Sequence, residues 1–134
     1  MPTPAGTGFT TPDSAIVATQ HGRVRGVLDH GVFAFKGVPY GAPTSGARRF
    51  RPPAPPEPWT GVRNAFVFGP ICPQHVYGRG ARPRLLDMPQ YDYSGEDCLV
   101  LNVWTPGVGD GVRRPVMVWL HGGAFLMGTA NRPA

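Results

Sequence analysis

The sequence is short of charged residues, and almost all of its 13 basic residues are arginine. Only 16% of its 134 residues are charged, against about 25% in an average soluble domain. Glycine and proline are abundant instead, with 19 and 17 residues, close to the fraction typical of loop-rich chains. The length suffices for one buried core. Few charges and many loops in a short chain indicate a piece of a larger protein.

Long apolar runs, repeats and targeting signals are also missing. The longest apolar run falls well short of the roughly 18 residues of a transmembrane helix, and no repeat is visible. The first residues have neither a charged n-region nor an apolar h-region, so no secretory signal is predicted. We therefore expect a cytoplasmic protein that does not bind membranes.

The net charge of +5 raises the question of nucleic-acid binding. Residues 1–84 carry ten basic and three acidic groups, whereas residues 85–112 carry five acidic groups and neither lysine nor arginine. The arginines are scattered among glycines and prolines, and no recognition helix, zinc finger or ribonucleoprotein motif accompanies them. We expect the two parts to pair within the fold, with no nucleic-acid partner.

The first forty residues predict a tail followed by β-structure. Residues 1–14 are read as a mobile N-terminal tail. Residues 16–19 predict a short strand, and residues 23–28 and 32–38 predict a hairpin around a turn that contains glycine. Pro39 should end it, because proline cannot donate to a β-ladder.

The middle of the chain predicts long loops. Residues 39–61 hold seven prolines and three glycines, which excludes regular structure over most of this stretch. Phe50 and Trp59 are expected to anchor this loop by burial. Residues 62–95 also read as irregular.

Two strong strand signals follow, at residues 99–105 and 116–120. The second is a continuous apolar run, typical of a strand buried on both faces of an α/β sheet. No long amphipathic helix is visible. The predicted fold class is therefore α/β, mostly strands and long loops, with the helices largely missing.

The motif that bears most directly on function is His-Gly-Gly-Ala-Phe at residues 121–125, directly after the apolar run. Paired glycines let the backbone turn and let a substrate approach closely. Neighbouring N–H groups aimed at one point stabilise the oxyanion of acyl transfer. A plain turn is the alternative interpretation.

Several further motifs occur in a fixed order along residues 17–128. They are Phe-Lys-Gly-Val-Pro-Tyr at 35–40, Pro-Trp-Thr-Gly-Val at 58–62, Cys-Pro-Gln at 72–74, Glu-Asp-Cys-Leu at 96–99, and the apolar run that ends in His-Gly-Gly. With these motifs, the chain resembles the type-B carboxylesterase family, which includes para-nitrobenzyl esterases and cholinesterases.

The resemblance implies the N-terminal part of an α/β-hydrolase domain, with residues 15–134 as an incomplete segment of it. The family reaction is ester hydrolysis through a serine acyl-enzyme. By resemblance, the amides of the oxyanion hole fall on Gly122, Gly123 and Ala124, and we favour Gly123 and Ala124. His121 should hold the loop rather than act as acid or base. The implied substrate is a small carboxylic ester, with no metal or organic cofactor.

The catalytic serine of the family is absent from this sequence. Its Gly-x-Ser-x-Gly elbow lies downstream of the oxyanion loop, and Ser14, Ser45 and Ser94 lie in no such pattern. The family's acid and catalytic histidine also lie downstream. We expect the 134-residue chain alone to be inactive as an esterase. Two alternatives are a non-catalytic esterase-like interaction module and a truncated gene product.

The resemblance also implies two structural pairs. Cys72 and Cys98 match a disulfide of many family members; free thiols, or a zinc site with His75, are the alternatives. Arg49 and Glu96 match a buried salt bridge of the family, and a solvated Arg49 is the alternative.

Overall fold

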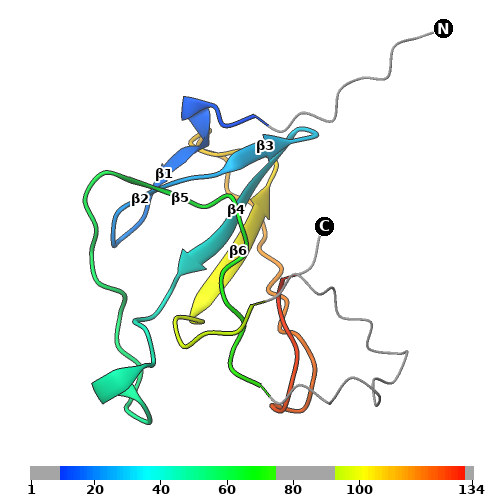
Figure 1. Ribbon diagram of the computed structural model, residues 1–134. Helices are drawn as coiled ribbons and strands as arrows, with labels where there is room; N and C mark the ends of the chain where they lie inside the picture. Colours follow the sequence, from blue (N-terminus) through cyan, green and yellow to red (C-terminus); the bar gives the residue numbers. More distant parts are fainter. Residues whose placement is uncertain (1–9, 75–92, 132–134) are drawn as a thin grey trace, which may run out of the picture. The chain divides into compact units, whose positions relative to one another are not determined.

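The computed structural model of the chain describes residues 10–74 and 93–131 (Figure 1). Within these ranges the regular structure consists of six strands and two short 3₁₀ turns, η1 (Asp13–Ala15) and η2 (Gly46–Arg48). None of the helical turns described is long and apolar enough to cross a membrane. The chain divides into two compact units.

The first unit comprises Met1–Val38, Glu57–Phe68 and Asn102–Pro115, and holds most of the β-structure. One of its sheets has the order β1-β2-β5, with β1 at Ile16–Ala18, β2 at Arg23–Arg25 and β5 at Val62–Asn64. β1 runs antiparallel to β2, and β2 runs parallel to β5. The short strand predicted at 16–19 is thereby confirmed.

The predicted hairpin is present in the second sheet, whose order is β3-β4-β6. β3 (Val27–Asp29) pairs antiparallel with β4 (Val32–Pro39), with Leu28 opposite Phe33. The turn residues His30 and Gly31 have φ of 47° and 80°, as a type I′ turn requires. β4 ends at Pro39 as predicted.

β6 (Val100–Thr105) is the other neighbour of β4 (Figure 1). It confirms the strand predicted at residues 99–105. Asn102 supports this pairing, because its Oδ1 accepts a hydrogen bond of 2.9 Å from the Gly37 amide.

Gly26 divides the run that the sequence predicts as one strand, residues 23–28. A Cβ at this position would lie 2.6 Å from the Ala34 carbonyl oxygen and 2.9 Å from the Phe35 ring. The missing side chain therefore lets the backbone approach β4 closely and pass from β2 in one sheet to β3 in the other.

The core of this unit is formed by Val24, Phe35 and Ala65, with partly buried apolar side chains around them. Ala65 links the two sheets through its backbone. Its N–H donates to the Arg25 carbonyl, and its carbonyl accepts from the Lys36 N–H, both at 2.8 Å.

Trp59 packs against this core and confirms the expected anchor. Its Nε1 donates to the Arg23 carbonyl at 2.9 Å. The same expectation is wrong for Phe50, which belongs to the second unit and is 94% exposed. Phe50 has φ of 58° in a turn, and its ring lies 5.0 Å from the Arg49 guanidinium rather than in a core.

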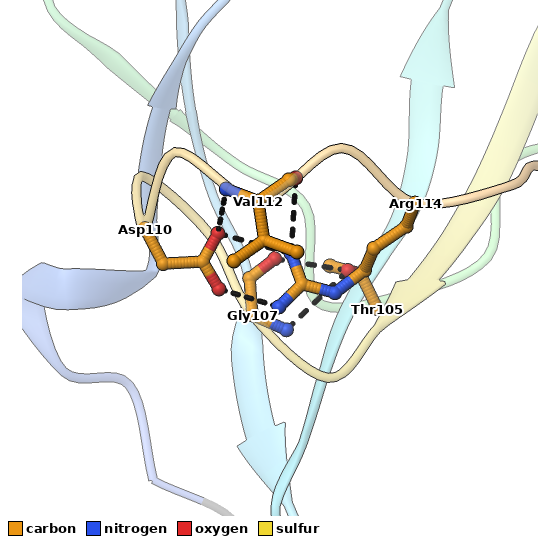
Figure 2. Close-up of polar contacts among 5 residues, drawn as sticks. All are labelled: Thr105, Gly107, Asp110, Val112 and Arg114. Carbon is orange, nitrogen blue, oxygen red and sulfur yellow. Dashed lines mark hydrogen bonds and ion pairs between the residues drawn. The ribbon is translucent and has the colours of Figure 1, made fainter.

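The loop after β6 is braced by an ion pair, drawn in Figure 2. Arg114 donates from Nη1 to Asp110 Oδ1 at 3.0 Å and from Nη2 to Oδ2 at 2.5 Å. The Val112 amide also donates to Asp110 Oδ1 at 3.0 Å. The Arg114 hydrogen bond, followed by the Val112 amide, lowers the pKa of Asp110 to about 2.

The predicted N-terminal tail, residues 1–14, lies mostly outside the described residues. Of its last five residues, Thr10 exchanges two backbone hydrogen bonds with Leu28, at 3.0 and 2.7 Å. Asp13 begins η1 and lies 3.2 Å from the Arg25 guanidinium. The part of the tail that is described therefore bonds to β2 and β3 within the first unit.

The second unit comprises Pro39–Pro56, Gly69–Leu101 and Val116–Ala134, and loops make up most of what is described of it. The strand predicted at residues 116–120 is wrong for this structure. These five residues form no strand, and each is 74–90% exposed. A buried parallel strand depends on neighbouring strands for its hydrogen bonds and on covering layers for its side chains, and the described residues supply neither to this run.

Candidate functional site

The His-Gly-Gly-Ala-Phe motif forms a tight left-handed turn in the second unit. Gly123, Ala124 and Phe125 have φ of 126°, 53° and 60°. The amides of Leu126 and Met127 both donate to the Gly123 carbonyl, at 3.0 and 3.2 Å. Two consecutive non-glycine residues at positive φ are uncommon, and such strain concentrates at functional sites.

The amides at the start of this turn are unengaged. In the described part of the chain, the N–H groups of Gly122, Gly123 and Ala124 donate to no protein atom, and all three residues are exposed. Free, neighbouring backbone donors of this kind can receive an oxygen atom from another molecule.

His121 contacts its own loop. Its Nδ1 lies 2.8 Å from the Gly122 carbonyl oxygen and is placed to donate to it. Among the described residues, no carboxylate pairs with the imidazole. This geometry suits a residue that holds the loop, as the sequence predicts, since the carboxylate partner of a catalytic histidine is missing there.

Gly128 closes the loop against its beginning. A Cβ on Gly128 would lie 2.5 Å from His121 Nδ1 and would also collide with the Gly122 carbonyl oxygen. Gly128 has φ of 124°, which L side chains rarely adopt. Residues 121–128 therefore form a loop whose two ends touch.

Two polar side chains hold the chain at the end of this loop and just after it, and sequence analysis assigned no role to either of them. Gln74 exchanges two hydrogen bonds with the Gly128 backbone, at 2.9 and 3.0 Å. Asn131, which is buried, donates from Nδ2 to the Gly69 carbonyl at 2.9 Å. The only signal for Gln74 was its place in the Cys-Pro-Gln motif.

The structure brings the two cysteines together as free thiols. Their Sγ atoms lie 3.2 Å apart, against about 2.05 Å in a disulfide. Burial, followed by the hydrogen bond with Cys72, raises the pKa of Cys98 to about 11. Burial also raises the pKa of Tyr40, and the nearby Cys72 and Cys98 thiols add to this rise.

Arg49 and Glu96 are also brought together, since Arg49 Nη1 donates to Glu96 Oε1. The burial expected of this pair is wrong, because the side chains are 56% and 32% exposed. Arg49 lies in an open loop just after η2, where water reaches the guanidinium. The Glu96 backbone is held more firmly, because its carbonyl accepts from both the N–H and the Oγ1 of Thr44.

Comparison with known proteins identifies the family of the chain that carries this loop. The sequence profile described as the carboxylesterase family matches residues 13–134. The chain belongs to the carboxylesterase family. It is 46% identical over 120 residues to the phenmedipham hydrolase of Pseudarthrobacter oxydans, covering 88% of this chain and 23% of that protein. It is 42% identical over 118 residues to the para-nitrobenzyl esterase of Bacillus subtilis, and this match covers 88% of this chain and 23% of that protein.

A solved esterase structure has a similar backbone over this segment. An esterase from Clostridium hathewayi, described as able to hydrolyse aliphatic aromatic polyesters, superimposes with a TM-score of 0.78 at 36% identity. The match covers 94% of this chain and 24% of the other. The chain thus corresponds to the N-terminal part of the carboxylesterase α/β-hydrolase fold. It spans less than a quarter of the length of these relatives.

The remaining site predictions for this carboxylesterase segment concern metal binding. Among the described residues, no group of three or more His, Cys, Asp or Glu side chains could hold a metal ion. His75, the third member of the zinc alternative, lies outside the described residues.

Proposed function

We propose that this chain supplies the oxyanion-hole loop of a serine carboxylic-ester hydrolase. The observation that carries the proposal is the left-handed turn at residues 123–125 together with its free amides. The N–H groups of Gly122, Gly123 and Ala124 donate to no described protein atom. Family membership supports it, because relatives over the same segment are named as ester hydrolases.

The proposed chemistry follows from these amides. A serine outside this chain attacks the carbonyl carbon of a small carboxylic ester. The carbonyl oxygen becomes negatively charged and accepts hydrogen bonds from the amides of Gly123 and Ala124, with Gly122 beside them. Water then releases the acid from the acyl-enzyme. Because Ser14, Ser45 and Ser94 form no nucleophile elbow, the 134-residue chain alone hydrolyses no ester by this route.

A chimera tests the proposal. The matching segment of the Bacillus subtilis para-nitrobenzyl esterase is replaced by residues 13–131 of this chain, and hydrolysis of a para-nitrobenzyl ester is measured. We expect sustained turnover that a serine-directed phosphonate abolishes. The isolated chain, assayed in parallel, should show no such turnover.

A matched pair of variants in the chimera assigns the activity to the loop. Ala124→Pro removes one N–H and, because proline fixes φ near −65° where Ala124 has 53°, it also undoes the left-handed turn. It should therefore lower kcat by at least about 10²-fold, the cost of one oxyanion donor. Ala124→Gly keeps the N–H and the positive φ, and should retain activity. A folded wild-type chimera without activity, or equal activity of the two variants, would contradict the proposal.

A further inference from the structure

We propose that Gln74 is a positioning residue of the oxyanion loop. Its side-chain amide holds the peptide of Gly128, and through Gly128 it fixes the backbone that carries the amides of Gly122 and Gly123. This inference rests on the proposed function, because positioning matters for catalysis only if these amides bind an oxyanion.

The contact between Gln74 and Gly128 has two points. The Gly128 N–H donates to Gln74 Oε1 at 2.9 Å, and Gln74 Nε2 donates to the Gly128 carbonyl at 3.0 Å. A reciprocal pair of this kind fixes both the position and the orientation of the peptide, as a neighbouring strand would. Gln74 is only partly exposed, so water competes less for these bonds than at an open surface.

The rest of the Gln74 amide is used as well. Nε2 also donates to the Cys72 carbonyl at 3.2 Å. One amide oxygen therefore accepts while the nitrogen donates to two carbonyls. Only a carboxamide offers this combination at this length. A glutamate carboxylate has no N–H to donate and would repel the two carbonyl oxygens. Methionine would make none of the three hydrogen bonds.

The segment that carries Gln74 is itself held. The Ile71 amide donates to the Tyr93 carbonyl at 2.9 Å, and the Gly95 amide donates to the Ile71 carbonyl at 3.0 Å. Ile71 thus forms a parallel bridge with Ser94. Gln74 therefore joins the loop to a backbone with its own hydrogen bonds.

Gly128 transmits this position to the amides. The Gly128 Cα packs so closely against the His121 ring and the Gly122 carbonyl oxygen that a Cβ would not fit between them. The peptide that joins Gly122 to Gly123 provides both that carbonyl and the Gly123 N–H. A shift of Gly128 therefore changes where the Gly123 N–H points, and a displacement of about 1 Å can cost about 10²-fold in rate.

The kinetic test uses Gln74→Met in the chimera, with Gln20→Met as the matched control. Gln20 is exposed in the turn between β1 and β2. We expect Gln74→Met to lower kcat by about 10- to 100-fold with KM nearly unchanged, and to weaken binding of a trifluoromethyl ketone transition-state analogue in parallel. Gln20→Met should match the wild type. A Gln74→Met chimera that is less heat-stable but has wild-type kcat per phosphonate-titrated site would overturn the proposal.

A second measurement on the full 134-residue chain separates this inference from the proposed function. Amide hydrogen exchange at Gly128, Leu126 and Met127 should accelerate about tenfold or more in Gln74→Met, because the bonds that hold the loop are lost. Exchange at Leu28 should be unchanged. Faster exchange with an inactive wild-type chimera would sink the proposed function but leave Gln74 as the residue that holds this loop; unchanged exchange would sink the role of Gln74.

Discussion

Asp110 and Arg114 form a bidentate ion pair across four residues of one loop, and the Val112 amide joins the same carboxylate (Figure 2). A fork of two guanidinium nitrogens on two carboxylate oxygens is more directional than a single contact. It fixes the loop between β6 and Pro115.

This pair predicts an acid-sensitive loop. Because the pKa of Asp110 falls from 3.8 to about 2 on folding, the pair stabilises the fold at pH values above 3.8. That contribution is lost as the pH falls from 3.8 through about 2. Melting temperatures are measured from pH 7 to pH 2. The fall in melting temperature at low pH should be smaller for Asp110→Asn than for the wild type. Asp13→Asn is the control, because the Asp13 side chain is 90% exposed and makes a single 3.2 Å contact. The same pH profile for Asp110→Asn and wild type would contradict the prediction.

Trp59 and Phe50 should respond very differently to truncation. Trp59→Ala removes a ring packed on the core and a hydrogen bond to Arg23, and should lower the free energy of unfolding by about 2 kcal/mol. Phe50→Ala removes a side chain that is 94% exposed and should change it by less than about 0.5 kcal/mol. Urea unfolding measures both, and equal losses would count against the anchor assigned to Trp59.

The cysteines should differ in reactivity. Alkylation requires the thiolate, and a pKa of about 11 leaves Cys98 almost fully protonated at pH 8. With substoichiometric iodoacetamide, peptide mapping should find the label on the exposed Cys72 first. Preferential labelling of Cys98 would refute this order.

A disulfide between Cys72 and Cys98 remains a prediction that the same chemistry can test. The Sγ atoms, 3.2 Å apart, need to approach by little more than 1 Å to bond. We expect diamide to block alkylation of both cysteines in the monomer and a reductant to restore it. Intact mass spectrometry measures this, and disulfide-linked dimers in place of a blocked monomer would argue against the pairing.

Gly128 and Gly122 offer a matched test of the closed loop. Gly128→Ala places a methyl group against His121 at φ of 124° and should cost about 1–3 kcal/mol locally. Gly122→Ala meets no atom within 4 Å and should be nearly neutral for stability. Limited proteolysis within residues 121–128 reports this difference; equal rates would mean that the loop is not closed as described.

Local patterns made much of this fold predictable. The hairpin follows from apolar runs on either side of Asp-His-Gly, and β6 follows from a β-branched and aromatic run. The split at Gly26 was not predictable in this way, because it depends on the approach of Ala34 and Phe35. The run at 116–120 has a strand's composition but lacks strand neighbours among the described residues. Pattern alone cannot tell these cases apart.

The candidate site was predictable only in part. The His-Gly-Gly run identified the loop, and the resemblance pointed to its amides. The role of His121 in holding the loop was predicted, but the contact of Gln74 with the end of the loop was not predictable, because Gln74 and Gly128 are 54 positions apart. A polar side chain beside a cysteine and a proline has no local signal for such a contact.

The two sheets of the first unit differ in how far apart along the chain their partners lie. Leu28 meets Phe33 across a two-residue turn, whereas Val24 must find Arg63. Closing the longer loop has the higher entropic cost, and distant pairings form more slowly than hairpins. During synthesis, both strands of the β3–β4 hairpin are available once Pro39 has left the ribosome. β2 cannot pair with β5 until residues 62–64 have also emerged. Refolding should therefore show a fast phase for the hairpin and a slower phase in which β2 pairs with β5.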